Sequence, residues 1–168
     1  MDLSKAEAGS LGLKRDWIDP ATVVDETRQH VAALAELAGV ELSTVLQGAP
    51  SSVFADPLHL KRLLVNLMSN AIQHTPRGGR AELRVLGGGE KTCVFEVEDT
   101  GQGIPEKARE LIFEKFGQAE ARNFNPSGAG LGLPLCKWVV RAHSGLIEVR
   151  SELGRGTTFR VEIPCEPE

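Results

Sequence analysis

The sequence has no apolar run long enough to cross a bilayer, because its longest apolar stretches are broken within about ten residues and a span needs ~20. No charged and then apolar signal peptide opens it. Its cysteines, Cys93, Cys136 and Cys165, are odd in number and lack the close pairing of a zinc site, which argues against a disulfide framework and a structural metal. We therefore expect a reduced, cytoplasmic protein.

The sequence also lacks an excess of positive charge. It has 19 lysines and arginines against 23 aspartates and glutamates, so the net charge is −4 and the pI is about 5.6. This balance disfavours a nucleic-acid binder with a basic surface, and equally an attachment to anionic membranes. With 168 residues, 41% of them hydrophobic and 25% charged, the chain should form one folded domain with no room for a second.

Hydrophobic periodicity and turn residues predict an α+β fold. Asp19-Pro20 and Asp56-Pro57 each supply an N-cap followed by a proline at the first helical position. Helices are expected at 20–38, 57–74 and 130–144, and strands at 13–18, 40–46, 80–86, 92–99, 145–151 and 156–163. Residues 100–129 should be mostly loop, with a turn or two of helix at 105–116. This order suggests a two-layer sandwich in which helices cover one face of a sheet.

The helix at 57–74 has an apolar arc and a polar arc. Leucines, Met68 and Ile72 fill the first arc, while the second carries His59, Asn66 and Asn70. Asparagine costs ~0.6 kcal/mol relative to alanine inside a helix, so two of them one turn apart suggest a function. Their amide oxygens could bind a hard cation such as Mg²⁺. A solvated polar face is the alternative interpretation.

An aspartate and two glycines follow the apolar strand at 92–99. Asp99 stands at the strand end, before Gly101 and Gly103, which make the following backbone flexible. An ionised carboxylate only accepts hydrogen bonds, so Asp99 would suit the exocyclic amino group of adenine and repel the carbonyl of guanine. A surface Asx turn followed by a glycine turn is the alternative.

A second glycine cluster precedes the third helix. Gly128, Gly130 and Gly132 allow close approach of the backbone where unpaired N–H groups and the helix dipole favour a phosphate. No Gly-Lys-Ser/Thr follows, as a P-loop needs, and Leu133 stands at the last glycine of a dinucleotide fingerprint. Pro134 is compatible with the first helical turn. An ordinary loop is the alternative.

Five segments combine into a specific signature. They are Asn66-Leu-Met-Ser-Asn70-Ala, Asp99-Thr-Gly101-Gln-Gly103, Ile112-Phe-Glu-Lys-Phe116, Gly128-Ala-Gly130-Leu-Gly132-Leu and Gly156-Thr-Thr-Phe159. In order and spacing this set resembles the ATP-binding domain of sensor histidine kinases, with its Bergerat (GHKL) fold. The resemblance covers residues 11–164 and implies a mixed sheet of about five strands with three helices on one face. It implies a catalytic domain at 11–168, and residues 1–10 resemble the end of a preceding dimerisation and phospho-acceptor helix.

The resemblance also implies roles in binding ATP and Mg²⁺, carried over by position. Asn66 and Asn70 would be the catalytic residues, with Asn70 coordinating Mg²⁺ and Asn66 supporting the metal and phosphates. Asp99 would bind the adenine amino group, with help from Thr157 through water. Residues 117–129 would form an ATP lid anchored by Phe113 and Phe116. The other residues implied to contact the nucleotide are Gln73, His74, Gly101, Gly103, Ile104, Arg122, Gly128, Gly130, Leu131, Gly132 and Leu133.

Three positions depart from the family pattern or invite a different interpretation. Gln73 stands where the family often has lysine or arginine, so His74 or Arg122 would have to supply the charge on phosphate. Ser144 replaces the second residue of a frequent Gly-Gly, which we interpret as a structural change. His143 should be a helix C-terminal residue favoured by the helix dipole rather than a catalytic one.

The residue at position 66 bears on the reaction. Related ATPases and serine kinases carry glutamate there as a base, whereas an asparagine cannot accept a proton near neutral pH. We therefore expect in-line transfer of the ATP γ-phosphoryl group to a histidine on a separate dimerisation domain of the same protein, and indirectly to a response regulator. The chain alone should be a monomer that does not phosphorylate itself. A nucleotide-binding module without transfer, or an ATPase of the same superfamily, is the alternative.

Overall fold

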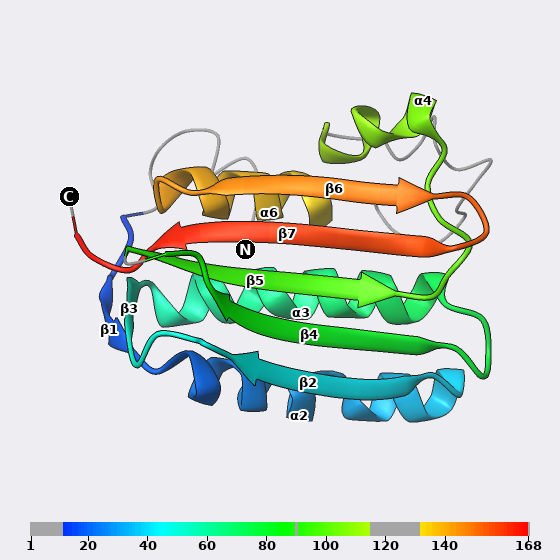
Figure 1. The fold of residues 1–168 in the computed structure, drawn as a ribbon, viewed down its shortest axis with the longest axis horizontal. Coiled ribbons are helices and arrows are strands. Elements are labelled where there is room, and N and C mark those ends of the chain that lie inside the picture. The colour runs from blue at the N-terminus through cyan, green and yellow to red at the C-terminus, as the bar shows by residue number, and fades with distance from the viewer. Residues whose placement is uncertain (1–11, 90, 115–131, 168) are drawn as a thin grey trace.

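A mixed sheet with three helices against one face makes up most of the protein (Figure 1). This computed structural model describes residues 12–89, 91–114 and 132–167. The helices of this layer are α2 (Pro20–Ala38), α3 (Pro57–His74) and α6 (Gly132–Ala142). The strands of the sheet are β2 (Glu41–Gln47), β4 (Arg80–Gly87), β5 (Thr92–Asp99), β6 (Leu146–Glu152) and β7 (Gly156–Pro164).

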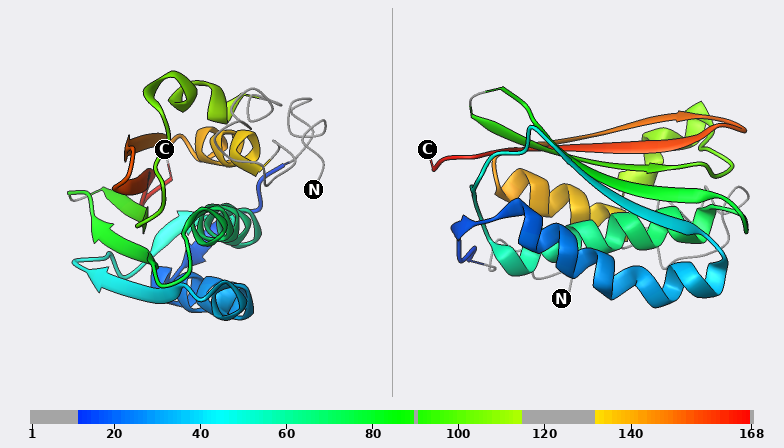
Figure 2. Two further views of the ribbon diagram at one scale, coloured as in Figure 1. Left: turned by 90° about the vertical axis from the view of Figure 1, so that its right-hand side faces the viewer. Right: turned by 60° about the horizontal axis from the view of Figure 1, so that its bottom comes forward.

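The strands of the sheet follow the order β2-β4-β5-β7-β6. Only β2 and β4 are parallel, and the other three neighbouring pairs are antiparallel. Figure 2 shows α2, α3 and α6 side by side in a layer under the sheet. This architecture confirms the predicted α+β sandwich with a five-stranded mixed sheet and three helices on one face.

Local sequence signals fix the ends of the two longer helices. The Asp19 side chain accepts a hydrogen bond from Ala21 N at 2.8 Å, and Asp56 accepts one from His59 N at 3.1 Å, so both predicted N-caps are confirmed. At the far end of α2, Gly39 has a φ of +67°, which favours glycine. The helix boundaries expected at 20–38 and 57–74 are therefore the observed ones.

The sequence did not predict one short pairing. β3 (Val53–Ala55) pairs antiparallel with β1 (Asp16–Ile18), and the rings of Trp17 and Phe54 lie 5.3 Å apart between centroids. A three-residue strand is too short to show a hydrophobic period, so only the tertiary fold reveals it. The expected turn of helix after β5 is present as α4 (Glu106–Arg109) and the 3-10 turn η1 (Leu111–Phe113).

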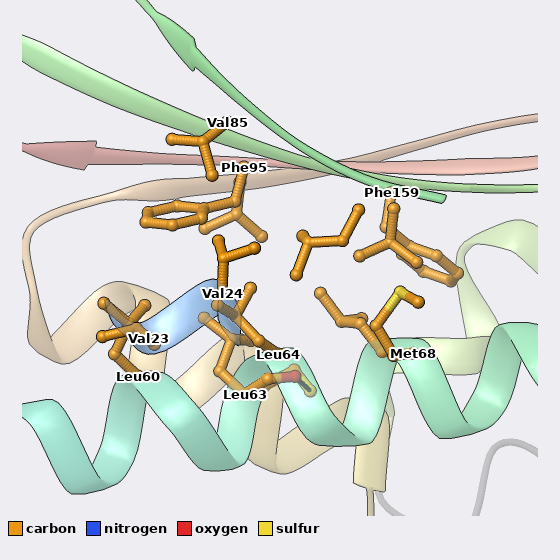
Figure 3. Packing of buried hydrophobic residues seen from close by; sticks show 14 of the residues in the cluster. Val23, Val24, Leu60, Leu63, Leu64, Met68, Val85, Phe95 and Phe159 are labelled. Carbon is orange, nitrogen blue, oxygen red and sulfur yellow. Dashed lines mark hydrogen bonds between the residues drawn. The ribbon is translucent and has the colours of Figure 1, made fainter. Parts of the chain in front are cut away.

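The core lies between the helical layer and one face of the sheet (Figure 3). Leu60, Leu64 and Met68 of α3 point toward Phe95 of β5 and Phe159 of β7, and all five are at most 1% exposed. Burying side chains of this size contributes about 1.5–3 kcal/mol each. The apolar arc predicted for the helix at 57–74 is therefore its core face.

The other face of the sheet is covered by a ladder of charged side chains. Arg84 of β4 lies between Glu82 and Glu96, and Arg160 of β7 donates a hydrogen bond to Glu96 at 2.9 Å. Such alternation of apolar and polar residues is typical of a sheet with one face in water. Among the described helices, none combines the length and apolar character needed to cross a bilayer.

Two histidines differ from their sequence-based interpretation. His59, expected on the polar arc, is 6% exposed, and its Nδ1 lies 3.0 Å from the Asp56 carboxylate. His143 is also buried: its Nδ1 lies 2.8 Å from the Val139 carbonyl, and its Nε2 accepts the Asp56 N–H at 3.0 Å. Burial lowers the pKa of His143, so the ring is a neutral acceptor. Its role is structural as expected, but stabilisation of a cation by the helix dipole is the wrong reason.

Ser144 gives a stability prediction because its φ of +57° lies in the left-handed region. A non-glycine residue in this conformation destabilises the folded state by about 1–2 kcal/mol. Glycine removes that strain, but it also increases the conformational entropy of the unfolded chain, which offsets part of the gain. We expect Ser144→Gly to raise the free energy of unfolding by roughly 0.5–1 kcal/mol in urea titrations. Ser144→Ala keeps the Cβ and should give no such gain. An equal gain from both variants would contradict the explanation by backbone strain.

Candidate nucleotide-binding site

A buried carboxylate lies at the end of β5. Asp99 is 4% exposed, and its Oδ1 accepts the Gly101 N–H at 2.9 Å. Burial raises the pKa of Asp99 to about 6, although hydrogen bonds from the backbone of Gly101 and Thr157 act in the opposite direction. Near neutral pH this group is therefore a charged acceptor held in a poorly solvated position. The expected placement of Asp99 at a strand end is confirmed.

The two glycines after Asp99 allow close packing of the loop that follows. A Cβ on Gly101 would lie 2.4 Å from the carbonyl oxygen of His74, the last residue of α3. Gly103 has a φ of +79°, and a Cβ there would lie 2.3 Å from the carbonyl oxygen of Glu152. The loop is thus fitted between the end of α3 and the end of β6, with no space for side chains at these positions.

Ser151 of β6 is a site residue that the sequence reasoning missed. Its Oγ accepts the Ile104 N–H at 2.7 Å and lies 2.8 Å from Thr157 Oγ1. It also donates to the Gly156 carbonyl at 3.0 Å. Ser151 therefore joins the loop after β5 to Thr157, which lies opposite Asp99 in the antiparallel pairing of β5 with β7. The available signal was its position two residues after Val149, on the half-buried face of β6.

Asn66 and Asn70 lie one turn apart on α3, and both are half-buried. The Asn66 side chain hydrogen-bonds the buried Cys136 thiol of α6, and this contact lowers the pKa of that thiol against the larger effect of burial. An amide oxygen is a ligand type that a hard cation accepts, so both asparagines stay candidate ligands for Mg²⁺. The described residues contain no group of three or more His, Cys, Asp or Glu side chains that could hold a metal ion.

Gln73 and His74 lie at the end of α3, where a charge on phosphate was expected from His74 or Arg122. Gln73 is exposed, and His74 is half-buried. Burial lowers the pKa of His74 to about 4, which disfavours a charged ring at pH 7, and its expected contact with phosphate stays a prediction. Arg122, the other expected source of charge, lies outside the described residues.

The second glycine cluster is described only at its end. Gly132 is the first residue of α6 and is exposed, so its backbone N–H lies at a helix start, where such groups have no intrahelical partner. The Leu133 side chain is 3% exposed and belongs to the core, so any contact with a nucleotide would come from its backbone. Phe116, Gly128, Gly130 and Leu131 lie outside the described residues, as do the expected lid at 117–129 and residues 1–10.

Phe113 connects the segment before the expected lid to the core. Its ring meets that of Phe159 edge to face, with 6.0 Å between centroids. Lys137 of α6 places its Nζ 6.0 Å from the centroid of the Phe113 ring. The aromatic side chain thus links η1 to both β7 and α6. The expected role of Phe113 as an anchor of the lid stays a prediction, because residues 117–129 lie outside the described residues.

Comparison of the sequence with models of known protein families shows which family this chain belongs to. Residues 55–167 match the model of the family described as histidine kinase-, DNA gyrase B- and HSP90-like ATPases. The chain belongs to this family. The matched residues include Asn66, Asn70, Asp99 and Thr157 and all of β4 to β7, so the candidate site lies within the match.

Curated relatives of this ATPase-family chain are histidine kinases. It is 38% identical to the circadian input-output histidine kinase CikA of Synechococcus elongatus, over 98% of this chain and 22% of CikA. It is 34% identical to the histidine protein kinase DivJ of Caulobacter vibrioides, over 98% of this chain and 27% of DivJ. The chain thus spans about a quarter of the length of these relatives, and it corresponds to the ATP-binding catalytic domain of a two-component sensor kinase.

Solved structures of histidine kinases share the fold of this family member. Full-length ShkA in complex with AMPPNP has a TM-score of 0.86 and 27% identity, over 98% of this chain and 34% of ShkA. The mycobacterial sensor histidine kinase MprB has a TM-score of 0.77 and 28% identity, over 92% of this chain and 99% of that chain. The fold expected from the sequence is therefore confirmed by independent structures.

Proposed function

We propose that this chain binds Mg-ATP and transfers the γ-phosphoryl group to a histidine on a dimerisation domain of the same protein. The observation that carries the proposal is Asp99, a charged acceptor buried at the end of β5 beside a loop with no room for side chains. An adenine amino group can donate to such a carboxylate, whereas a guanine carbonyl cannot. The complex of ShkA with AMPPNP supports a nucleotide in this fold.

The residues of α3 fit the chemistry proposed. The oxygens of Asn66 and Asn70 are the ligand type that Mg²⁺ prefers, and bound Mg-ATP would supply the phosphoryl group and neutralise its charge. Asn66 cannot take a proton from water, which disfavours hydrolysis. An imidazole nitrogen needs little activation: it would form the new N–P bond as the bond from phosphorus to the β–γ bridging oxygen breaks and ADP leaves.

The histidines of the chain favour an acceptor elsewhere. His59 and His143 are at most 6% exposed, so neither can meet a phosphoryl donor without unfolding. His30 is exposed on α2, and it follows Arg28-Gln29 rather than the acceptor-like sequence that precedes such histidines in the family. We propose a cytoplasmic, monomeric catalytic domain that serves a receiver domain indirectly through the phosphorylated histidine.

Incubation with γ-labelled ATP tests the proposal. The chain alone should take up no stable label, and adding the histidine-bearing domain of the same protein should place acid-labile label on that domain. Stable label on histidine of the chain alone would contradict the proposal, and release of inorganic phosphate without labelled histidine would favour an ATPase. Binding of ATP without either product would indicate a nucleotide-binding module.

The role of Asn70 can be tested in the same assay. Asn70→Ala removes one oxygen ligand, so we expect the Mg²⁺-dependent part of ATP affinity to fall roughly tenfold or more and transfer to fall with it. Ser69→Ala, a neighbouring change on the same helix, is the matched control and should retain both. Calorimetric titration of ATP with Mg²⁺ and with EDTA measures the difference. Equal Mg²⁺ dependence in Asn70→Ala and the parent would overturn the assignment.

A further inference from the structure

Three polar side chains lie in a row across the ends of neighbouring strands. Ser151 of β6 lies opposite Thr157 of β7, and Thr157 lies opposite Asp99 of β5. Residues opposite each other in an antiparallel pairing project their side chains to the same face of the sheet. Figure 1 shows the corresponding ends of β5, β7 and β6 side by side on its right. Thr157 therefore lies between Ser151 and the carboxylate that we propose to bind adenine.

The Ser151 hydroxyl makes three polar contacts but has a single proton. Its Oγ accepts the Ile104 N–H at 2.7 Å, and it lies 3.0 Å from the Gly156 carbonyl oxygen and 2.8 Å from Thr157 Oγ1. Because a carbonyl oxygen can only accept, the Ser151 proton is donated to Gly156. The contact between the two hydroxyl groups is then a hydrogen bond only if Thr157 donates its proton to Ser151. This placement of the protons satisfies all three contacts and leaves Thr157 Oγ1 with lone pairs alone.

The backbone on either side of Ser151 is held in place. Gly156 has a φ of +119°, and a Cβ there would collide with the Asp99 carbonyl oxygen. On the other side, the Arg109 guanidinium donates to the Ile104 carbonyl at 3.4 Å and also to the Ser151 carbonyl. Close backbone packing and the guanidinium bridge thus keep the Ser151 hydroxyl between a fixed donor and a fixed acceptor.

The direction of the Thr157 proton matters for Asp99. The Thr157 N–H already hydrogen-bonds the Asp99 carboxylate, as does the Gly101 N–H. A threonine whose N–H reaches a carboxylate can offer its hydroxyl to the same carboxylate by rotation about the Cα–Cβ bond. There the proton would occupy a lone pair that an adenine amino group needs, and it would stabilise the charged carboxylate. In the structure the proton is donated to Ser151 instead.

We propose that Ser151 is a positioning residue for nucleotide binding, which takes the Thr157 proton and so keeps the Asp99 carboxylate open to the amino group of the base. This inference rests on the proposed function, because it explains how the adenine acceptor of that function stays available. Ser151 acts through Thr157 and Asp99 and needs no contact of its own with the nucleotide. Its loss frees the Thr157 hydroxyl to bond Asp99, which competes with the base and lowers the pKa of Asp99 from its raised value of about 6.

The titration of Asp99 tests this proposal without nucleotide. Aspartate carboxyl carbons are labelled with ¹³C, and the NMR signal that is absent from Asp99→Asn is followed from pH 8 to pH 4. We expect Asp99 to titrate near pH 6 in the parent and at least about 0.5 pH unit lower in Ser151→Ala. Ser151→Thr keeps the hydroxyl and should titrate like the parent. Ser43→Ala is the matched control, because the Ser43 hydroxyl donates to Glu82 at 2.8 Å, on the charged face of the sheet.

A double variant separates proton placement from damage to the loop. Loss of the Ser151 hydroxyl also removes the acceptor of the Ile104 N–H, and better access of water would by itself lower a pKa that burial raises. Ser151→Ala combined with Thr157→Val has no threonine hydroxyl to offer Asp99, so the pKa of Asp99 should return to its value in Thr157→Val alone. A double variant that titrates as low as Ser151→Ala overturns the proposal. So does a higher pKa of Asp99 in Thr157→Val than in the parent, which would mean that the hydroxyl already donates to Asp99.

The other charged and titratable groups around Asp99 are the same in all these variants. Glu98, the preceding residue of β5, adds to the effect of burial in raising the pKa of Asp99. The elements packed around the strand end carry His74, Arg80, Arg109, Glu152 and Arg155. Because none of these groups is replaced, a difference in titration between the variants reports on the two hydroxyl groups.

Calorimetric titration with ATP at pH 7.5 connects the proton placement to binding. Ser151→Ala should raise the Kd for ATP roughly three- to tenfold, whereas Ser151→Thr and Ser43→Ala should not. If Asp99 titrates as expected in every variant but the parent binds no ATP, the proposed function fails and the placement of the proton stands. If the parent binds ATP and Ser151→Ala binds it equally well, the positioning role is overturned while the proposed function stands.

Discussion

We expect Asp99→Asn to bind ATP more weakly than the parent and to be more stable than the parent at neutral pH. The ionised carboxylate accepts hydrogen bonds, whereas the asparagine side chain also presents an N–H group toward the position of the adenine amino donor. Losing a hydrogen bond to a buried charged acceptor costs about 1.5–3 kcal/mol, so ATP affinity should fall roughly 10- to 100-fold. The preference for ATP over GTP should disappear with it, since only the carboxylate repels the guanine carbonyl.

The gain in stability follows from the raised pKa of Asp99. Burial raises this pKa from 3.8 to about 6, so the folded state favours the protonated form. The contribution of Asp99 to stability is therefore full below pH 3.8 and is lost as the pH rises through 6. Above pH 7, holding the charge in the fold costs on the order of 3 kcal/mol at most, and an amide removes that cost. We expect Asp99→Asn to unfold at a higher temperature at pH 7.5 and to lose this advantage near pH 4.

The matched control for Asp99→Asn is Glu98→Gln, the same chemical change one residue earlier in β5. Glu98 lies on the charged face of the sheet and pairs with Arg84, so its replacement should leave the ATP affinity unchanged. Calorimetric titration with ATP and GTP, together with thermal unfolding at pH 4 and 7.5, measures both effects. If Asp99→Asn binds ATP as the parent does, the adenine-binding role is wrong. Unchanged or lower stability at pH 7.5 would contradict the burial cost.

The prediction of the helices succeeded because their signals are local. The N-cap Asp56, the proline after it and the apolar arc of α3 are all contained within one stretch of sequence. The position of Asp99 at a strand end was equally local, since strand alternation stops there. Each of these features depends on residues within a few positions along the chain, and the structure confirms them.

The features that the sequence did not reveal depend on neighbours distant in sequence. His59 lies on the polar arc of α3, but Trp138 of α6, 6.1 Å away between ring centroids, contributes to its burial. Burial lowers the pKa of His74 to about 4, and a helical wheel does not show this loss of solvent. Ser151 joins Ile104 to Thr157 across a gap of 47 residues. A single sequence records the polarity of such residues but not which segment will cover them.

We expect Gly101→Ala to weaken ATP binding and to lower the stability of the fold. The change in stability is opposite in sign to that expected for Asp99→Asn. The added Cβ would lie 2.4 Å from the His74 carbonyl oxygen and 2.9 Å from Asp99 Oδ1. The first neighbour is backbone at the end of α3, so no side-chain rotation relieves the contact and the loop must move. Overpacking of this kind costs about 1–3 kcal/mol. Movement of the loop also breaks the hydrogen bond from Gly101 N to Asp99, so ATP affinity should fall roughly tenfold or more.

Gly12→Ala is the control, because a Cβ on Gly12 meets nothing within 4 Å. It should match the parent in urea titrations and in ATP affinity, and circular dichroism at 15–20 °C should show that Gly101→Ala is still folded where its affinity is measured. Asp99→Asn and Gly101→Ala then change stability in opposite directions while both weaken ATP binding. General damage to the fold cannot produce that pair of results, whereas a site that holds a buried charge in a loop without space for side chains requires it. A stable Gly101→Ala with full ATP affinity would show that the loop after β5 does not shape the site.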